Sequence, residues 1–113
     1  MKWVHGKMAP AALESGRAAM KREQYEKAQA RLADAQKSFA AAYGDEHEWT
    51  MEVMALRAWC LVKVGRTTEG VKLYQDVKDT TDRVHGAGSK QSEELVRHLQ
   101  WAQYQAGGTR QHS

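Results

Sequence analysis

Small and apolar residues recur along the chain at alternating steps of three and four, which places them on one face of an α-helix. The clearest stripe consists of Tyr25, Ala28, Leu32, Ala35, Phe39 and Ala42. A second stripe in the same register follows 42 residues later, at Thr67, Gly70, Tyr74, Val77, Thr81 and Val84. Two amphipathic helices related by a fixed offset indicate an internal repeat.

The same offset relates other residues that have distinct structural roles. The pairs are Gly16 and Ala58, Gly44 and Gly86, Thr50 and Ser92, Trp59 and Trp101, and Gly65 and Gly107. Gly44 and Gly86 each follow a long stripe, where a glycine with positive φ commonly ends a helix. Thr50 and Ser92 are placed to cap the N-terminus of the next helix.

The pattern predicts an all-α fold of five helices. Their expected bounds are Pro10–Arg22, Gln24–Tyr43, Met51–Val64, Thr68–Val84 and Glu93–Ala106. Gly65–Arg66 is then the tight turn of a helical hairpin, between a shorter helix and a longer one. Such hairpins bury their apolar faces by stacking on one another.

The repeat also sets the expected domain organisation. The units are an N-terminal segment (1–8), copy one (9–50), copy two (51–92), a closing helix (93–106) and a tail (108–113), with the repeat domain over 9–107. Thr67 and Gly70 stand in copy two where copy one has Tyr25 and Ala28. We therefore expect the second hairpin to be packed more loosely than the first.

Length and cysteine content narrow the class of protein. The 113 residues fit one domain with a modest core. Cys60 is the only cysteine, so an internal disulfide is excluded and a reducing compartment fits. The first residues lack the apolar core of a signal peptide, and no apolar run reaches the ~18 residues of a membrane span. We expect an intracellular protein, in the cytoplasm or alternatively in an organelle matrix.

The charge is uneven along the chain. The net charge is +3, and residues 1–40 alone hold eight basic and four acidic side chains. A basic segment is compatible with an acidic partner. The candidate contacts for an acidic protein or a nucleic acid are Lys7, Arg17, Lys21, Lys27 and Arg31. Nucleic acid is disfavoured, because no arginine-rich run and no base-stacking motif accompanies them.

The reactive side chains form no catalytic pattern. None of the five histidines has a metal-ligand spacing such as His-x3-His, and Cys60 has no cysteine companion. Cys60 lies on an apolar helix face beside Trp59, which predicts an inert packed thiol. The glycines of "GAGS" follow a helix rather than a strand, so they form no phosphate-binding loop. We expect no enzymatic activity, no metal site and no cofactor.

The hairpin turn and its surroundings resemble a known repeat family. Gly65 to Tyr74 resembles the tetratricopeptide turn, and Tyr25–Glu26–Lys27–Ala28, followed by Leu32 and Ala35, is closer still. The period of 42 and the loop "GDEH" are similar to the kinesin-light-chain type of this repeat. The resemblance implies a short right-handed superhelix whose concave surface is lined by the first helix of each repeat.

Carried over by position, the resemblance implies a partner-binding face. Its residues are Arg17, Lys21, Leu56, Trp59, Lys63, Arg97, His98, Trp101 and Tyr104. Aromatic anchors flanked by basic residues suit a protein or peptide segment with acidic and apolar side chains. Alternatively, Trp59 and Trp101 fill the space between adjacent hairpins. We favour a partner contact for Trp101, since the inward stripe of the last helix is formed by other residues.

Two functions follow from the resemblance. The first is a non-catalytic scaffold or adaptor that binds a partner segment through the concave face. The second is a structural subunit held permanently in a large multiprotein complex, such as an organellar one. Family members usually carry Asn on the groove-facing helix, and this chain has Ala55, Leu56, Arg97 and His98 there. That departure favours the second function.

Overall fold

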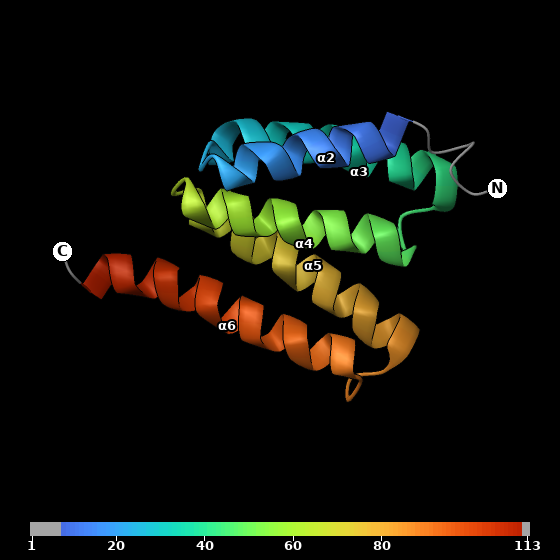
Figure 1. Ribbon diagram of the computed structural model, residues 1–113. Coiled ribbons are helices and arrows are strands. Elements are labelled where there is room, and N and C mark those ends of the chain that lie inside the picture. Colours follow the sequence, from blue (N-terminus) through green and yellow to red (C-terminus); the bar gives the residue numbers. More distant parts are fainter. Residues whose placement is uncertain (1–7, 112–113) are drawn as a thin grey trace.

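Residues 8–111 fold into a single stack of five helices (Figure 1). The computed structural model describes the backbone of residues 8–111 and the side chains of residues 11–107. The helices are α2 (Met8–Lys21), α3 (Tyr25–Tyr43), α4 (Glu48–Lys63), α5 (Thr67–His85) and α6 (Lys90–Gln111). Consecutive helices are antiparallel, and each packs mainly against its neighbours in the chain. The all-α hairpin fold expected from the sequence is therefore confirmed.

Glycines with positive φ end the two long helices and form the second hairpin turn. The φ angles are 99° at Gly44, 90° at Gly65 and 96° at Gly86. The N–H groups of Gly44 and Gly86 donate to Ala40 O and Asp82 O, the carbonyls four residues earlier. These three positions match the sequence prediction. The equivalent turn of the first hairpin uses Glu23, the non-glycine residue with positive φ (60°) in the described chain, 42 residues before Gly65.

The starts of α4 and α6 differ from the prediction. α4 begins at Glu48, where the Trp49 N–H donates to Nδ1 of His47 over 3.1 Å. α6 begins at Lys90, and the Ser92 N–H donates to Oγ of Ser89 over 3.1 Å. His47 and Ser89 are therefore the capping residues, and the N-cap roles predicted for Thr50 and Ser92 are wrong.

Thr50 and Ser92 are instead buried within the first turn of their helices. The Thr50 hydroxyl donates to Gly44 O over 2.8 Å, and the Ser92 hydroxyl donates to the Asp82 carboxylate. Both hydroxyls therefore tie a helix start to the end of the preceding long helix. The two positions are equivalent in the repeat, but their shared role is a tertiary hydrogen bond.

The last helix is longer than expected. α6 continues through Gln111, and Gly107 has no positive φ, so residues 108–111 are helical rather than an irregular tail. No helix follows α6 in the described chain, so a turn at Gly107 would gain no packing contacts. Continuing the helix keeps the backbone N–H and C=O groups hydrogen-bonded. Met8 is already helical, and the rest of the expected N-terminal segment lies outside the described residues, as do residues 112 and 113.

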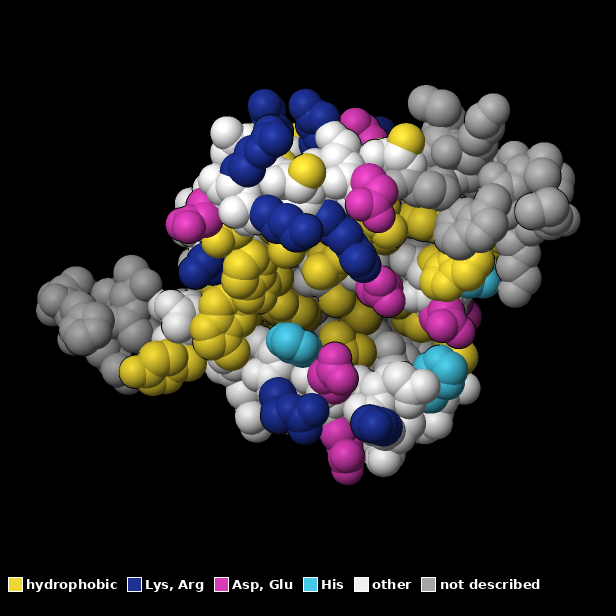
Figure 2. Space-filling model, viewed as in Figure 1, with side chains coloured by type: hydrophobic (Ala, Val, Ile, Leu, Met, Phe, Trp, Pro, Cys, Tyr) yellow, Lys and Arg dark blue, Asp and Glu magenta, His cyan; other side chains and the backbone are white. Residues whose placement is uncertain are grey.

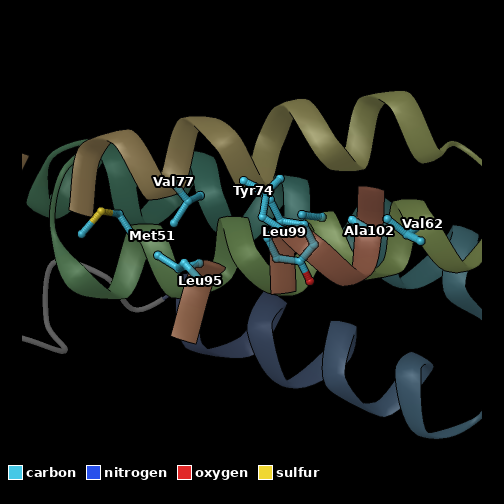
Figure 3. Packing of buried hydrophobic residues seen from close by; sticks show 8 residues of the cluster. Met51, Val62, Tyr74, Val77, Leu95, Leu99 and Ala102 are labelled. Carbon is cyan, nitrogen blue, oxygen red and sulfur yellow. The ribbon is translucent and has the colours of Figure 1, made fainter. Parts of the chain in front are cut away.

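Two hydrophobic clusters share α4. The first joins α2, α3 and α4 through Ala19, Ala28, Leu32, Ala35, Phe39, Val53 and Cys60. The second joins α4, α5 and α6 through Met51, Ala58, Val62, Tyr74, Val77, Leu95, Leu99 and Ala102 (Figure 3). The stripes predicted from spacing supply most of these residues. Val84 is an exception, since it is 47% exposed near the end of α5.

Gly70 allows a close contact between the two helices of the second hairpin. A Cβ atom at this position would lie 2.6 Å from Cγ2 of Val62 and 2.9 Å from the backbone oxygen of Ala58. The missing side chain therefore lets α5 approach α4 closely. Gly16 allows a similar approach in the first hairpin, where a Cβ atom would lie 2.8 Å from Cδ2 of Leu32, so the looser packing expected for the second hairpin stays a prediction.

Candidate functional site

An apolar groove of about 590 Å³ runs along one face of the stack. The lining residues come from α2, α4, α5 and α6: Met20, Glu48, Met51, Glu52, Ala55, Leu56, Trp59, Tyr74, Val77, Thr81, His85, Gln91, Glu94, Leu95 and His98. Figure 2 shows an apolar band across this face, with basic and acidic side chains along one edge and His and acidic side chains along the other. A groove of this size is typical of sites that hold a small ligand or several side chains.

One end of the groove is aromatic. Trp59 meets Tyr25 edge to face, with ring centroids 5.3 Å apart, and stacks on Trp101 at 6.3 Å. Nζ of Lys63 lies 5.4 Å from the Trp59 ring and 5.6 Å from the Tyr25 ring, within cation–π range. Both tryptophans are only partly buried, so they join α4 to α6 and still present surface to solvent.

The other part of the groove is acidic. Glu48, Glu52 and Glu94 line it, and no lysine or arginine does so among the residues whose side chains are described. Nη2 of Arg17 donates to Glu52 over 2.9 Å, and Nε2 of His98 lies 3.9 Å from the Glu94 carboxylate. Glu52 and Glu94 are 42 residues apart, so one position of the repeat places a carboxylate on each wall.

The predicted site residues fall into three groups. Leu56, Trp59 and His98 line the groove. Arg17, Lys63 and Trp101 lie beside it, in contact with Glu52 or the aromatic rings. Lys21, Arg97 and Tyr104 are exposed and outside the lining, and Tyr104 is 71% exposed.

Sequence reasoning missed Glu48, Glu94 and the contribution of α5. α5 supplies Tyr74, Val77, Thr81 and His85 to the groove, although the resemblance implied lining by the first helix of each repeat alone. The repeat offset could have identified the Glu52 and Glu94 pair, since both have the same residue type at one repeat position. The apolar stripe of α5 predicted that Tyr74, Val77 and Thr81 are buried, but no local pattern distinguishes a residue buried between helices from one that also lines a groove.

The buried reactive groups do not suit chemistry in this groove. Burial raises the pKa of the Cys60 thiol to about 11, so the nucleophilic thiolate is scarce at neutral pH. Burial, with a smaller contribution from Cys60, also raises the pKa of Tyr74, whose ring stacks on His98 at 5.8 Å. Over the described range, no three or more His, Cys, Asp or Glu side chains are grouped to hold a metal ion.

Comparisons with known proteins identify the repeat. No helix between residues 8 and 111 has the length and apolarity to cross a membrane. A search of curated proteins and a search of solved structures gave no match. A family model described as tetratricopeptide repeat matches residues 7–83, which covers the two helical hairpins and stops before α6. The matched region and the hairpin geometry agree, and the chain belongs to the tetratricopeptide repeat family.

Proposed function

We propose that this protein is a non-catalytic adaptor that binds a segment of a partner protein along the groove formed by α2, α4, α5 and α6. The single observation that supports this function is the apolar groove of about 590 Å³, which the chain's described side chains leave open. Exposed apolar surface of this kind commonly marks an interaction site. Membership of the tetratricopeptide repeat family suggests a protein partner.

The aromatic end supplies the anchor in this proposal. Trp59 lines the groove and is braced by Tyr25 on one side and Trp101 on the other. A braced tryptophan loses little side-chain entropy on binding, and such residues often dominate binding energy. Lys63, over the Trp59 and Tyr25 rings, would offer a charge to an acidic residue of the partner at this end, as expected from the sequence.

The second candidate is a subunit held permanently in a larger complex. A large exposed side chain outside the groove favours it, since Tyr104 on α6 is 71% exposed. Analytical ultracentrifugation across a concentration series tests this candidate. A stable, well-behaved monomer would argue against an obligate subunit.

The experiment that tests the adaptor function compares groove and surface variants in affinity capture with mass spectrometry. Leu56→Arg places a charge in the groove, and Trp59→Ala removes the anchor. Val84→Arg adds the same charge to an exposed position outside the groove, as the matched control. We expect the first two variants to lose a partner that wild type and Val84→Arg retain, with circular dichroism confirming that all variants are folded.

If Leu56→Arg and Trp59→Ala capture the same proteins as wild type, the groove is not the binding site. Trp101→Ala and Tyr104→Ala then test the second candidate, a subunit held permanently in a larger complex. Loss of a partner through these residues alone, with the groove variants unaffected, favours permanent contact through α6.

A further inference from the structure

The groove has a charge opposite to that of the whole chain. The protein is basic, at net +3, yet the charged residues that line the groove are Glu48, Glu52 and Glu94, within the part of the chain with described side chains. Glu48 and Glu52 are one helical turn apart on α4, where like charges reinforce each other's field. Glu94 lines the same groove from α6, so both α4 and α6 contribute carboxylates to it.

These carboxylates are only partly neutralised by the protein itself. Arg17 pairs with Glu52, whose side chain is still 60% exposed. The Glu94 side chain is 61% exposed, and its ion-pair contact with a described side chain is the distant one of 3.9 Å to His98. Lys63 lies over the aromatic rings at the other end of the groove. A concave, apolar surface with uncompensated carboxylates concentrates negative potential and attracts cations.

The length of the groove sets the size of its occupant. Glu48 and Trp59 are eleven residues apart on α4, which corresponds to about 16 Å along the helix. An amphipathic helix of about three turns spans this distance and presents apolar anchors at i, i+3 or i+4, and i+7. Met51, Leu56 and Leu95 offer the matching apolar surface between the charged walls.

We infer that the groove binds a cationic amphipathic segment of a partner protein, with the apolar stripe on the groove floor and Lys or Arg side chains beside Glu48, Glu52 and Glu94. This inference rests on the proposed function and adds the chemistry of the partner. An acidic segment is disfavoured in the same place, because its carboxylates would face three others with no basic lining residue among the described side chains.

Two labelled synthetic peptides of about 15 residues, each an amphipathic helix of about four turns, test the inference. They share one Leu and Ala stripe and differ only in flanking Lys or Glu residues. Fluorescence anisotropy measures binding to the full chain at low salt and at about 300 mM salt. We expect the Lys peptide to bind at least about tenfold more tightly than the Glu peptide, with a preference that shrinks in high salt.

The variants Glu48→Gln and Glu94→Gln test whether the preference comes from the groove. Each variant is expected to lower the affinity for the Lys peptide about two- to fivefold, as for partly exposed ion pairs. Glu93→Gln is the matched control, because Glu93 is the exposed neighbour of Glu94 on α6 and is not part of the lining. It should leave the affinity unchanged.

The outcomes separate this inference from the function on which it rests. Tighter binding of the Glu peptide, sensitive to Leu56→Arg, would overturn the cationic partner and keep the groove as the binding site. If the affinity for the Lys peptide is unchanged in Glu48→Gln, Glu94→Gln and Leu56→Arg, the binding is non-specific. This result would also overturn the cationic partner. Absence of binding by either peptide up to about 1 mM would overturn the inference, while affinity capture with Leu56→Arg decides on the groove independently.

Discussion

Gly70 shows how one residue sets the distance between two helices. Alanine at this position would place Cβ 2.6 Å from Cγ2 of Val62 and 2.9 Å from the Ala58 backbone oxygen. The carbonyl cannot move aside as a flexible side chain would. We expect Gly70→Ala to lower the free energy of unfolding by about 1–3 kcal/mol, although alanine has the higher helix propensity. Urea denaturation followed by circular dichroism measures the change.

Gly88→Ala is the control for this substitution. Gly88 has no heavy atom within 4 Å of a Cβ position and has no positive φ, so its replacement should change stability very little. Equal stability of the Gly70→Ala and Gly88→Ala proteins would contradict the close approach of α5 to α4.

Cys60 couples burial to the stability of the protein at alkaline pH. Burial raises the pKa of the folded thiol from 9.0 to about 11. Between these values the folded state holds a proton that the unfolded state has lost, so the free energy of unfolding falls as pH rises. We expect a loss of about 2 kcal/mol from this group by pH 11. The raised pKa of Tyr74 adds to the fall.

Denaturation at several pH values in the alkaline range measures this loss. Cys60→Ala removes the thiol, so its stability should decline less steeply with pH than that of wild type, whatever its stability at neutral pH. Parallel declines of the two proteins would show that Cys60 does not titrate with a raised pKa.

At the scale of the elements, the sequence predicted helices well and their first residues poorly. The pattern predicted all five described helices, most clearly the two long ones whose apolar stripes recur at an offset of 42, because burial on one face imposes a period that local sequence retains. The N-caps were misassigned because Thr50 and Ser92 donate to groups on the preceding helix, which are distant in sequence. Capping preferences report only local hydrogen bonds, so they cannot detect such tertiary partners.

The candidate site was also predicted only in part, because local sequence does not show which residues come together after folding. Position in the repeat located Leu56, Trp59 and His98 on the groove. The acidic character of the groove was not predicted, because net charge was counted along segments of the sequence. Glu52 and Glu94 are distant in sequence and line one groove only in the folded stack. The positive φ at Glu23 was likewise invisible, since glutamate has no preference for that region and only its offset to Gly65 marks the turn.

At the scale of the whole molecule, stability is distributed along the stack rather than concentrated in one centre. Each helix packs mainly on its chain neighbours, and α4 alone contributes to both hydrophobic clusters. In such an arrangement the free energy is close to a sum of terms for neighbouring units, so one end can open without the other. The terminal helices α2 and α6 each have one principal neighbour in the described chain, so we expect the stack to open from its ends.

Paired substitutions at the two ends of the stack test this distribution. Leu99, on α6, and Leu32, on α3, are 7% and 0% exposed, and replacing either with alanine should remove about 2–5 kcal/mol of local stability. We expect Leu99→Ala to accelerate amide hydrogen exchange in α5 and α6 while α2 and α3 stay protected, and Leu32→Ala to do the reverse. Equal acceleration in every helix for both variants would contradict this, because the stack would then unfold as one cooperative unit. Selective release of α6 would also remove Glu94 and Leu95 from the groove, so binding of the partner segment should restore protection to α6 in the Leu99→Ala protein.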